Sequence, residues 1–180
     1  MFISLVLCMA SCMENAQFTT AELNFAKPFM RTDTAIYKSD SDQIDTIIFH
    51  AASIDTVRLR NMAQGFYNDN ILRVSYELTP KCYHKFTVPS TDGNPVYFIS
   101  FAKVKDSYST KEIYFLGLLF NEKYLDHVEP IKEKSILFSE DRAVYKDVDI
   151  NETIRNFEFD FDRGVVSFVD IKGIKWRRIN

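Results

Sequence analysis

The sequence predicts an all-β domain of antiparallel strands, either a β-sandwich or a curled, barrel-like sheet of about 11 strands. The 180 residues include 16 Phe and 9 Tyr but only 5 Gly, and aromatic side chains favour the pleated surface of a sheet. Short β-branched and aromatic runs recur every 8–12 residues or so, as in sandwiches and barrels. The chain has no long amphipathic pattern, so we expect at most a short N-terminal helix.

Composition and charge narrow the class of protein. Apolar residues make up 46% of the chain and charged residues 26%, which is typical of a globular domain. The length predicts a single domain. A net charge of -3 offers no electrostatic basis for binding nucleic acid, so we expect no nucleic-acid partner.

The first ten residues carry no charge. This run is too short to span a membrane, but it suits the apolar region of a secretory signal. It leads into Met9-Ala10-Ser11-Cys12, which resembles the lipobox of bacterial lipoproteins. The resemblance implies cleavage before Cys12 and a diacylglyceryl group on its sulfur, whereas bulky Leu7 makes Cys8 a poorer candidate. We therefore expect a signal peptide over 1–11, a tether over 12–18 and one β domain over 19–180; the alternative is a short buried N-terminal strand.

The first elements of the domain follow local signals. Thr19, Thr20 and Glu22 resemble a capping box, which predicts a helical turn over Ala21–Ala26 that Pro28 ends. The runs Ile44–Phe49 and Ile54–Leu59 predict a β-hairpin. Ile71–Leu78 alternates apolar with polar residues, as in an antiparallel strand with one buried face.

Two later runs, Val96–Val104 and Ile113–Phe120, are apolar at nearly every position. Such runs are typical of central strands covered on both faces. We therefore expect burial on both sides of the second run, at Phe115, Leu116, Leu118 and Phe120.

The C-terminal third continues as strands. Ser135–Ser139 and Ala143–Asp149 flank a polar turn, Glu140–Arg142, and predict another hairpin. A left-handed Gly164 in the following hairpin would place Phe161 opposite Val165. That register would bury one face, made of Phe157, Phe159, Phe161, Val165 and Val169. The basic residues of the tail predict an edge strand protected by charge: Lys172, Lys175, Arg177 and Arg178.

The layout resembles a broad group of small, uncharacterised lipoproteins of Bacteroidota. The likeness rests on Phe25–Phe29, on Asp33–Ser39 followed by Asp45-Thr46, and on an ending with Arg163–Val166 and Lys172–Trp176. It implies a membrane-anchored, non-catalytic β-protein, and it implies no ligand and no site residues.

Three Asp-Thr pairs precede a small or aliphatic residue, and their threonines are Thr34, Thr46 and Thr56. They resemble acceptors of O-linked glycans in the same phylum. The alternative is structural, because Asp begins strands at turns and Thr suits strands.

Metal-binding patterns are incomplete. Cys82 and His84 share a strand face and could bind zinc with His50 or His127, but structural zinc usually takes four ligands in paired spacings. Two acidic groups could hold calcium or perform acid–base chemistry, although solvated faces are commoner: Glu158, Asp160 and Asp162, and Asp40, Asp42 and Asp45. We expect neither a metal nor a cofactor.

Enzyme signatures such as Gly-x-Ser-x-Gly, His-Glu-x-x-His and a glycine-rich phosphate loop do not occur, so we expect no enzyme. Five aromatic residues near turns and strand ends could stack on sugar rings: Tyr67, Tyr83, Tyr108, Tyr124 and Trp176.

The expected function is that of a lipid-anchored cell-envelope lipoprotein that acts as a non-catalytic binding or structural component. Its expected location is the outer membrane, on the periplasmic face or the cell surface. Its expected partners are the membrane, through the lipid on Cys12, and a protein or a glycan. The alternative is an accessory glycan-binding lipoprotein of an outer-membrane uptake system.

Overall fold

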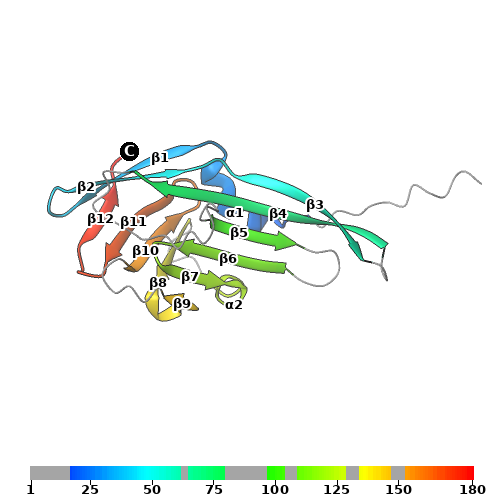
Figure 1. The fold of residues 1–180 in the computed structure, drawn as a ribbon. Coiled ribbons are helices and arrows are strands. Elements are labelled where there is room, and N and C mark those ends of the chain that lie inside the picture. Colours follow the sequence, from blue (N-terminus) through cyan, green and yellow to red (C-terminus); the bar gives the residue numbers. More distant parts are fainter. Residues whose placement is uncertain (1–16, 62–64, 80–96, 104–108, 129–133, 147–152) are drawn as a thin grey trace, which may run out of the picture.

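A computed structural model describes residues 17–61, 65–79, 97–103, 109–128, 134–146 and 153–180 (Figure 1). In these residues twelve strands form one antiparallel curled sheet, a half-barrel, which confirms the predicted fold class in its curled form. The strand order is β8-β10-β11-β12-β1-β2-β4-β5-β6-β7-β9, and β3 pairs with β4 beside this path. The strands are β1 (Asp33–Ser39), β2 (Ile44–Phe49), β3 (Ser53–Asn61), β4 (Gly65–Leu78), β5 (Tyr97–Lys103), β6 (Ser109–Phe115), β7 (Leu118–Asn121), β8 (Ser135–Ser139), β9 (Tyr145–Lys146), β10 (Ile154–Asp160), β11 (Gly164–Asp170) and β12 (Lys175–Arg178).

The helices are short. The predicted capping box is confirmed, because Thr19 and Glu22 exchange hydrogen bonds at the start of α1 (Thr20–Ala26). The chain continues beyond α1 as one 3₁₀ turn, η1 (Lys27–Phe29), since proline is tolerated in the first turn of a helix. Two further short elements are α2 (Glu122–Leu125) and the 3₁₀ turn η3 (Glu140–Arg142).

The predicted hairpin of Ile44–Phe49 with Ile54–Leu59 is wrong. Both runs pair with β4, β2 along residues 76–78 and β3 along residues 65–73. The amide of His50 donates to the carbonyl of Ser75 between them, at 2.9 Å. The two runs therefore follow the same edge of β4 with a bend at residues 50–52. These residues include no Gly, Asn or Asp, which readily adopt the positive φ of a tight reversal.

The strand predicted over Ile113–Phe120 is instead a hairpin. Leu116 and Gly117 have φ of 44° and 90°, as in a two-residue hairpin turn, and Phe115 pairs with Leu118. Phe115, Leu116, Leu118 and Phe120 are all buried as predicted, although two strands and the turn between them share the burial.

The described part of the predicted strand Val96–Val104 is β5. This strand is also not covered on both faces. Ile99 pairs with Val74 and Tyr97 with Ser75, so Phe98 is an extra residue in the ladder. This bulge buries the neighbours Phe98 and Ile99 together, whereas Tyr97 and Ala102 stay half-buried. In contrast, the predicted alternation in β4 is confirmed, with Leu72, Val74 and Tyr76 buried.

The predicted register of the β10–β11 hairpin is wrong. Gly164 has the expected left-handed φ of 76°, but it pairs with Asp160, and Val165 pairs with Phe159 rather than with Phe161. The Asp160 carboxylate accepts hydrogen bonds from the amides of residues 162 and 163, which stabilises a three-residue loop. A second shift in the ladder pairs Phe157 with Phe168, so Phe168 is buried while Val169 and Phe161 are half-buried.

The two ends of the sheet lie close together. Ser135–Ser139 and Tyr145–Lys146 do not form the predicted hairpin, because β8 pairs with β10 and β9 pairs with β7. Since η3 joins β8 to β9, the opposite ends of the strand order must meet. Phe120 and Phe138 pack across this gap, with 4.9 Å between ring centroids. The basic tail is not at an edge, because β12 pairs with both β11 and β1.

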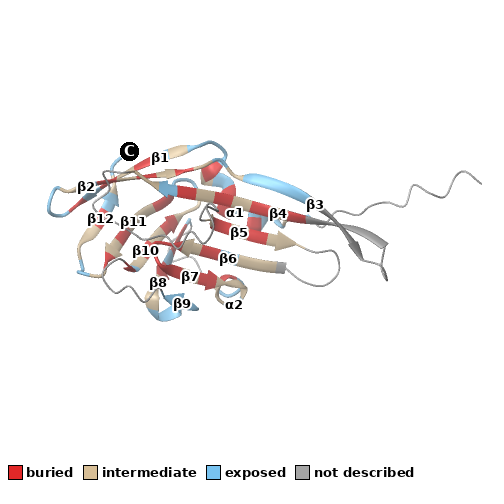
Figure 2. Ribbon diagram, viewed as in Figure 1, coloured by how far each residue is buried: buried red, intermediate tan, exposed pale blue. Residues whose placement is uncertain are grey.

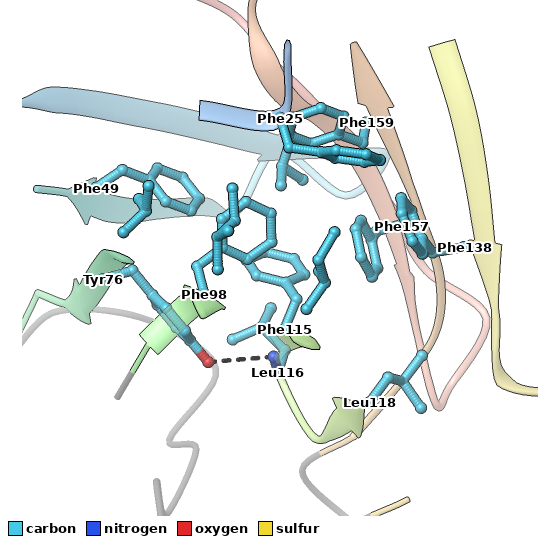
Figure 3. Packing of buried hydrophobic residues seen from close by; sticks show 14 of the residues in the cluster. Phe25, Phe49, Tyr76, Phe98, Phe115, Leu116, Leu118, Phe138, Phe157 and Phe159 are labelled. Carbon is cyan, nitrogen blue, oxygen red and sulfur yellow. Dashed lines mark hydrogen bonds between the residues drawn. The ribbon is translucent and has the colours of Figure 1, made fainter. Parts of the chain in front are cut away.

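The buried residues lie mainly on the strands of the curl (Figure 2), where their aromatic rings pack together as the core (Figure 3). Phe115 lies near its centre, 5.0 Å from the Phe157 ring and 5.6 Å from the Phe98 ring. The N-terminal helical segment contributes two further rings. Phe25 packs against Phe159, and Phe29 lies 5.0 Å from Phe49, so α1 and η1 fill part of the concave face.

Candidate functional site

The predicted anchor, Cys12, lies outside the described residues. The chain joins the packed body at Phe18, which is half-buried against the core. The N-cap residue Thr19 follows directly, so α1 begins at the point where the predicted tether of 12–18 ends.

An ion-pair cluster around the buried Glu22 holds α1 against the sheet. Glu22 is almost fully buried, and its carboxylate lies 3.1 Å from Lys103 Nζ and 3.4 Å from Lys111 Nζ. Lys111 also contacts Asp126, at 2.6 Å, just after α2. Burial alone would raise the pKa of Glu22, but hydrogen bonds from Thr19 and from Lys103 outweigh it and lower the pKa. The sequence indicated Thr19 and Glu22 through their spacing but offered no local signal for lysines that come some 80 residues later.

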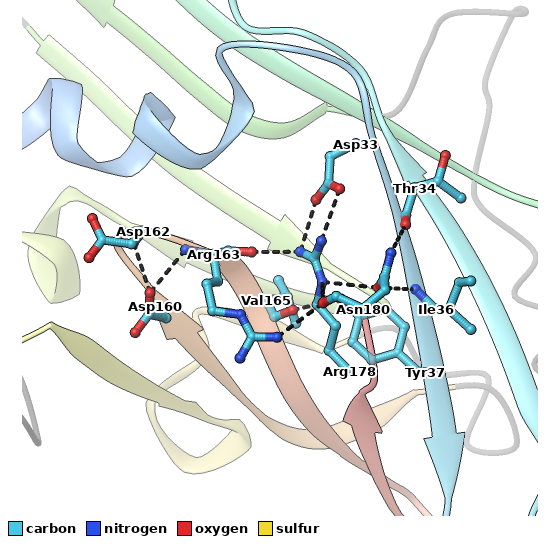
Figure 4. Close-up of polar contacts among 10 residues, drawn as sticks. All are labelled: Asp33, Thr34, Ile36, Tyr37, Asp160, Asp162, Arg163, Val165, Arg178 and Asn180. Atoms are coloured by element: carbon cyan, nitrogen blue, oxygen red, sulfur yellow. Dashed lines mark hydrogen bonds and ion pairs between the residues drawn. The ribbon is translucent and has the colours of Figure 1, made fainter.

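A second polar cluster fastens the C-terminal strand (Figure 4). Both carboxylate oxygens of Asp33 contact the guanidinium of Arg178, at 2.8 and 2.9 Å. The side chain of Asn180 bonds to the backbone of Thr34 and Ile36 in β1. Arg178 also donates to the carbonyl of Arg163, at 2.6 Å. The cluster therefore joins β1, β12 and the start of β11, and its contacts are those of a structural clasp.

The acidic residues at the end of β10 and in the loop after it have separate roles. Asp160 caps the loop described above, and Asp162 forms ion pairs with Lys27 and Lys134. Hydrogen bonds from Lys134 and Lys27 lower the pKa of Asp162 to about 2. The hydroxyl of Ser167 lies 3.5 Å from Glu158. These three carboxylates therefore do not point toward one common site where a ligand could bind.

The second acidic group is also dispersed. Asp40 pairs with Arg177, Asp42 pairs with Lys38, and Asp45 is buried in β2. Asp42 has a φ of 63° in the turn between β1 and β2. Asp40 and Asp42 therefore stabilise the turn and its neighbouring strands.

The zinc candidates are only partly described, because Cys82 and His84 lie outside the described residues. His50 lies 3.8 Å from Glu77, and His127 is exposed after α2. Nowhere in the described ranges do three His, Cys, Asp or Glu gather as a metal ion would require.

The predicted aromatic platform loses two of its members. Trp176 is fully buried and stacks on Phe168, with 5.8 Å between centroids, because β12 lies inside the sheet. Tyr124 is half-buried, and its hydroxyl donates to the carbonyl of Leu137. The side chain of Tyr67, and Tyr83 and Tyr108 altogether, lie outside the described part of the chain.

The three predicted glycan acceptors lie in strands. Thr34 in β1 and Thr56 in β3 are exposed, and Thr46 in β2 is half-buried. The Thr56 hydroxyl donates to the Asn70 side chain across the β3–β4 ladder, at 2.8 Å. Glycosylation at these positions stays a prediction.

Among the residues described, no helix has the length and apolar character needed to cross a bilayer. Comparisons of the chain with protein-family models, with curated proteins and with solved structures found no match.

Proposed function

We propose that this protein is a lipoprotein of the bacterial cell envelope, anchored through a lipid on Cys12, and that the half-barrel is a non-catalytic binding or structural component. The observation that carries the proposal is the order of features at the N-terminus. An uncharged run ends in Ala10-Ser11-Cys12, and six residues later Phe18 packs against the body. Six residues span at most about 20 Å, so the anchor would hold the body close to the membrane.

The packing of the body supports a non-catalytic role. Aromatic rings fill the concave face of the sheet, the place where barrels commonly hold a ligand. The acidic candidates that the sequence singled out are engaged in loop capping and ion pairs. These contacts stabilise the fold and leave those carboxylates poorly placed for acid–base chemistry. The burial of Trp176 removes one candidate for a sugar platform, and no observation on the described residues favours the glycan-binding alternative.

The anchor is tested by expressing the full chain in a bacterium with its native leader. We expect the wild-type protein to partition into detergent and to incorporate a labelled fatty acid. Cys12→Ala should abolish both while leaving the melting temperature of the body unchanged, because α1 begins eight residues later.

Cys8→Ala is the matched control, since it removes a neighbouring thiol without touching the proposed lipidation site. It should behave as the wild type. Equal labelling of the wild-type and Cys12→Ala proteins would overturn the proposal.

A further inference from the structure

The β3–β4 hairpin extends beyond the rest of the sheet (Figure 1). Strand β5 pairs with β4 only from Asn70 onward, and β2 pairs only with residues 76–78. Residues 57–61 of β3 and 65–69 of β4, here called the ribbon, pair with each other and with no other strand in the described part of the chain. A two-stranded ribbon is only marginally stable alone in water, so contact with another surface would stabilise it.

The base of the ribbon lies beside the entry point of the tether. Asn70 pairs with Thr56 on one side and with Lys103 on the other. The Nζ atom of Lys103 lies 3.1 Å from the carboxylate of Glu22, in the first turn of α1. The residues that follow the proposed lipid anchor therefore enter the body at the base of the ribbon.

The lengths of the ribbon and the tether are similar. Five residues of strand extend about 17 Å from the Thr56–Asn70 pair. The six residue steps from Cys12 to Phe18 span at most about 20 Å. A bilayer that held a lipid on Cys12 would thus lie within reach of the end of the ribbon.

The ribbon's charge suits such a surface. The ribbon has two arginines, Arg58 and Arg60, and one acidic residue, Asp69, which pairs with Val57 at its base. Its outer four residue pairs, 58–61 with 65–68, include both arginines and no acidic residue, whereas the whole chain has a net charge of -3. The same pairs include Leu59, Phe66 and Tyr67, and the register places Leu59 opposite Tyr67. Arginine is attracted to anionic headgroups, and aromatic residues favour the membrane–water interface.

From these observations we propose that the ribbon docks on the anionic headgroup surface of the bilayer in which the lipid on Cys12 is anchored. This proposal rests on the proposed function, because the lipid on Cys12 is what would bring the chain to the membrane. It adds a second attachment, so that the body would be held at two points and have a defined orientation.

The test places a tryptophan on the ribbon of the full lipidated chain. The Tyr67→Trp protein is reconstituted in vesicles that contain anionic lipids with brominated acyl chains, which quench nearby tryptophan. The native Trp176 is fully buried and supplies a constant background. We expect loss of emission from the ribbon tryptophan. No loss is expected for Ile44→Trp, because Ile44 is an exposed residue at the far end of β2.

Charge is tested by adding Arg58→Gln and Arg60→Gln to the Tyr67→Trp protein, which should relieve the quenching. The matched pair Arg31→Gln and Arg142→Gln removes the same charge from exposed positions outside the ribbon and should leave quenching unchanged. In a soluble form of the chain, each ribbon arginine should contribute about fivefold to the affinity for anionic vesicles.

The two proposals can fail separately. Co-flotation with vesicles reports the anchor, whereas quenching reports the ribbon. A chain that co-floats with an unquenched ribbon tryptophan keeps the anchor and overturns the docking. If the chain carries no lipid, the same variant mixed with excess anionic vesicles tests the ribbon alone, and unchanged emission overturns it. A ribbon that pairs with a second copy of the chain would give an unquenched dimer, which also overturns the proposal.

Discussion

The interior and the rim of the half-barrel are held together by different forces. The interior is a continuous group of buried rings, in which Phe115 alone lies within about 6 Å of five other aromatic rings. The polar contacts that fasten α1 and β12 to the sheet, here called the rim, are ion pairs and caps such as Glu22–Lys103 and Asp33–Arg178. Hydrophobic burial is non-directional and contributes most of the stability, whereas each ion pair contributes less but requires a defined geometry. The interior therefore determines whether the chain folds, and the rim determines how its elements are placed.

The largest expected effect tests the interior. Phe115→Ala should lower the free energy of unfolding by about 3–5 kcal/mol, because it leaves a cavity among rings that cannot all move to fill it. Urea denaturation measures the change. The control is Ile54→Ala, at a residue that is 54% exposed, which should change the stability by less than about 0.5 kcal/mol. Similar losses from both variants would mean that the ring cluster is not the main source of stability.

A second experiment examines the fit between the interior and the N-terminal helical segment. Gly164 has a φ of 76°, and a Cβ atom there would lie 2.8 Å from Cζ of the fully buried Phe29. Gly164→Ala should therefore cost about 2–4 kcal/mol, from backbone strain together with steric overlap. Gly173 has a φ of 85° with nothing within 4 Å of the added Cβ, so Gly173→Ala should cost only the strain, about 1–2 kcal/mol.

The difference between the two glycine variants isolates the overlap with Phe29. Phe29→Leu shortens the side chain that the new methyl group meets. Phe29→Leu should therefore destabilise the Gly164→Ala protein less than it destabilises the wild type. Thermal unfolding of the wild type, the two single variants and the double variant measures the difference. Additive effects would show that η1 does not press on the start of β11 in solution.

The smallest effect concerns the rim. Glu22→Gln should lower the free energy of unfolding by about 1–2 kcal/mol, because it removes a charge that two lysines and the Thr19 amide contact. The control is Asp42→Asn, whose ion pair with Lys38 is largely exposed and should contribute less than about 0.5 kcal/mol.

The pH dependence sharpens this third prediction. Since the pKa of Glu22 is lower in the folded protein than its ordinary value of 4.5, its charge stabilises the fold above that pH. The stabilisation is lost as the pH falls further and the carboxylate becomes protonated. The gap in melting temperature between the wild type and Glu22→Gln should therefore narrow below about pH 4.5. A gap that stays constant from pH 7 to pH 3 would contradict the role assigned to the charge.

Several features of the candidate regions were predictable because their signals are local. The capping box needs only Thr19 and Glu22 at the right spacing, and Gly164 needs only a turn between two strands. The tether and the lipidation of Cys12 also depend on local sequence, and they stay predictions. The basic partners of Glu22 and Asp33 were not predictable, because they come from strands far along the chain.

The sequence by itself determined the class of the fold and the buried face of several strands. Alternation at period two identifies a strand and its apolar face without reference to any neighbour, as in Leu72, Val74 and Tyr76. Only the tertiary structure decided which strands pair, because pairing depends on contacts between distant segments. It converted Ile113–Phe120 into a hairpin, placed β2 and β3 along one edge of β4 and moved the basic tail into the sheet. A buried turn such as Leu116-Gly117 has the same apolar composition as the strands that it joins, so composition alone cannot locate it.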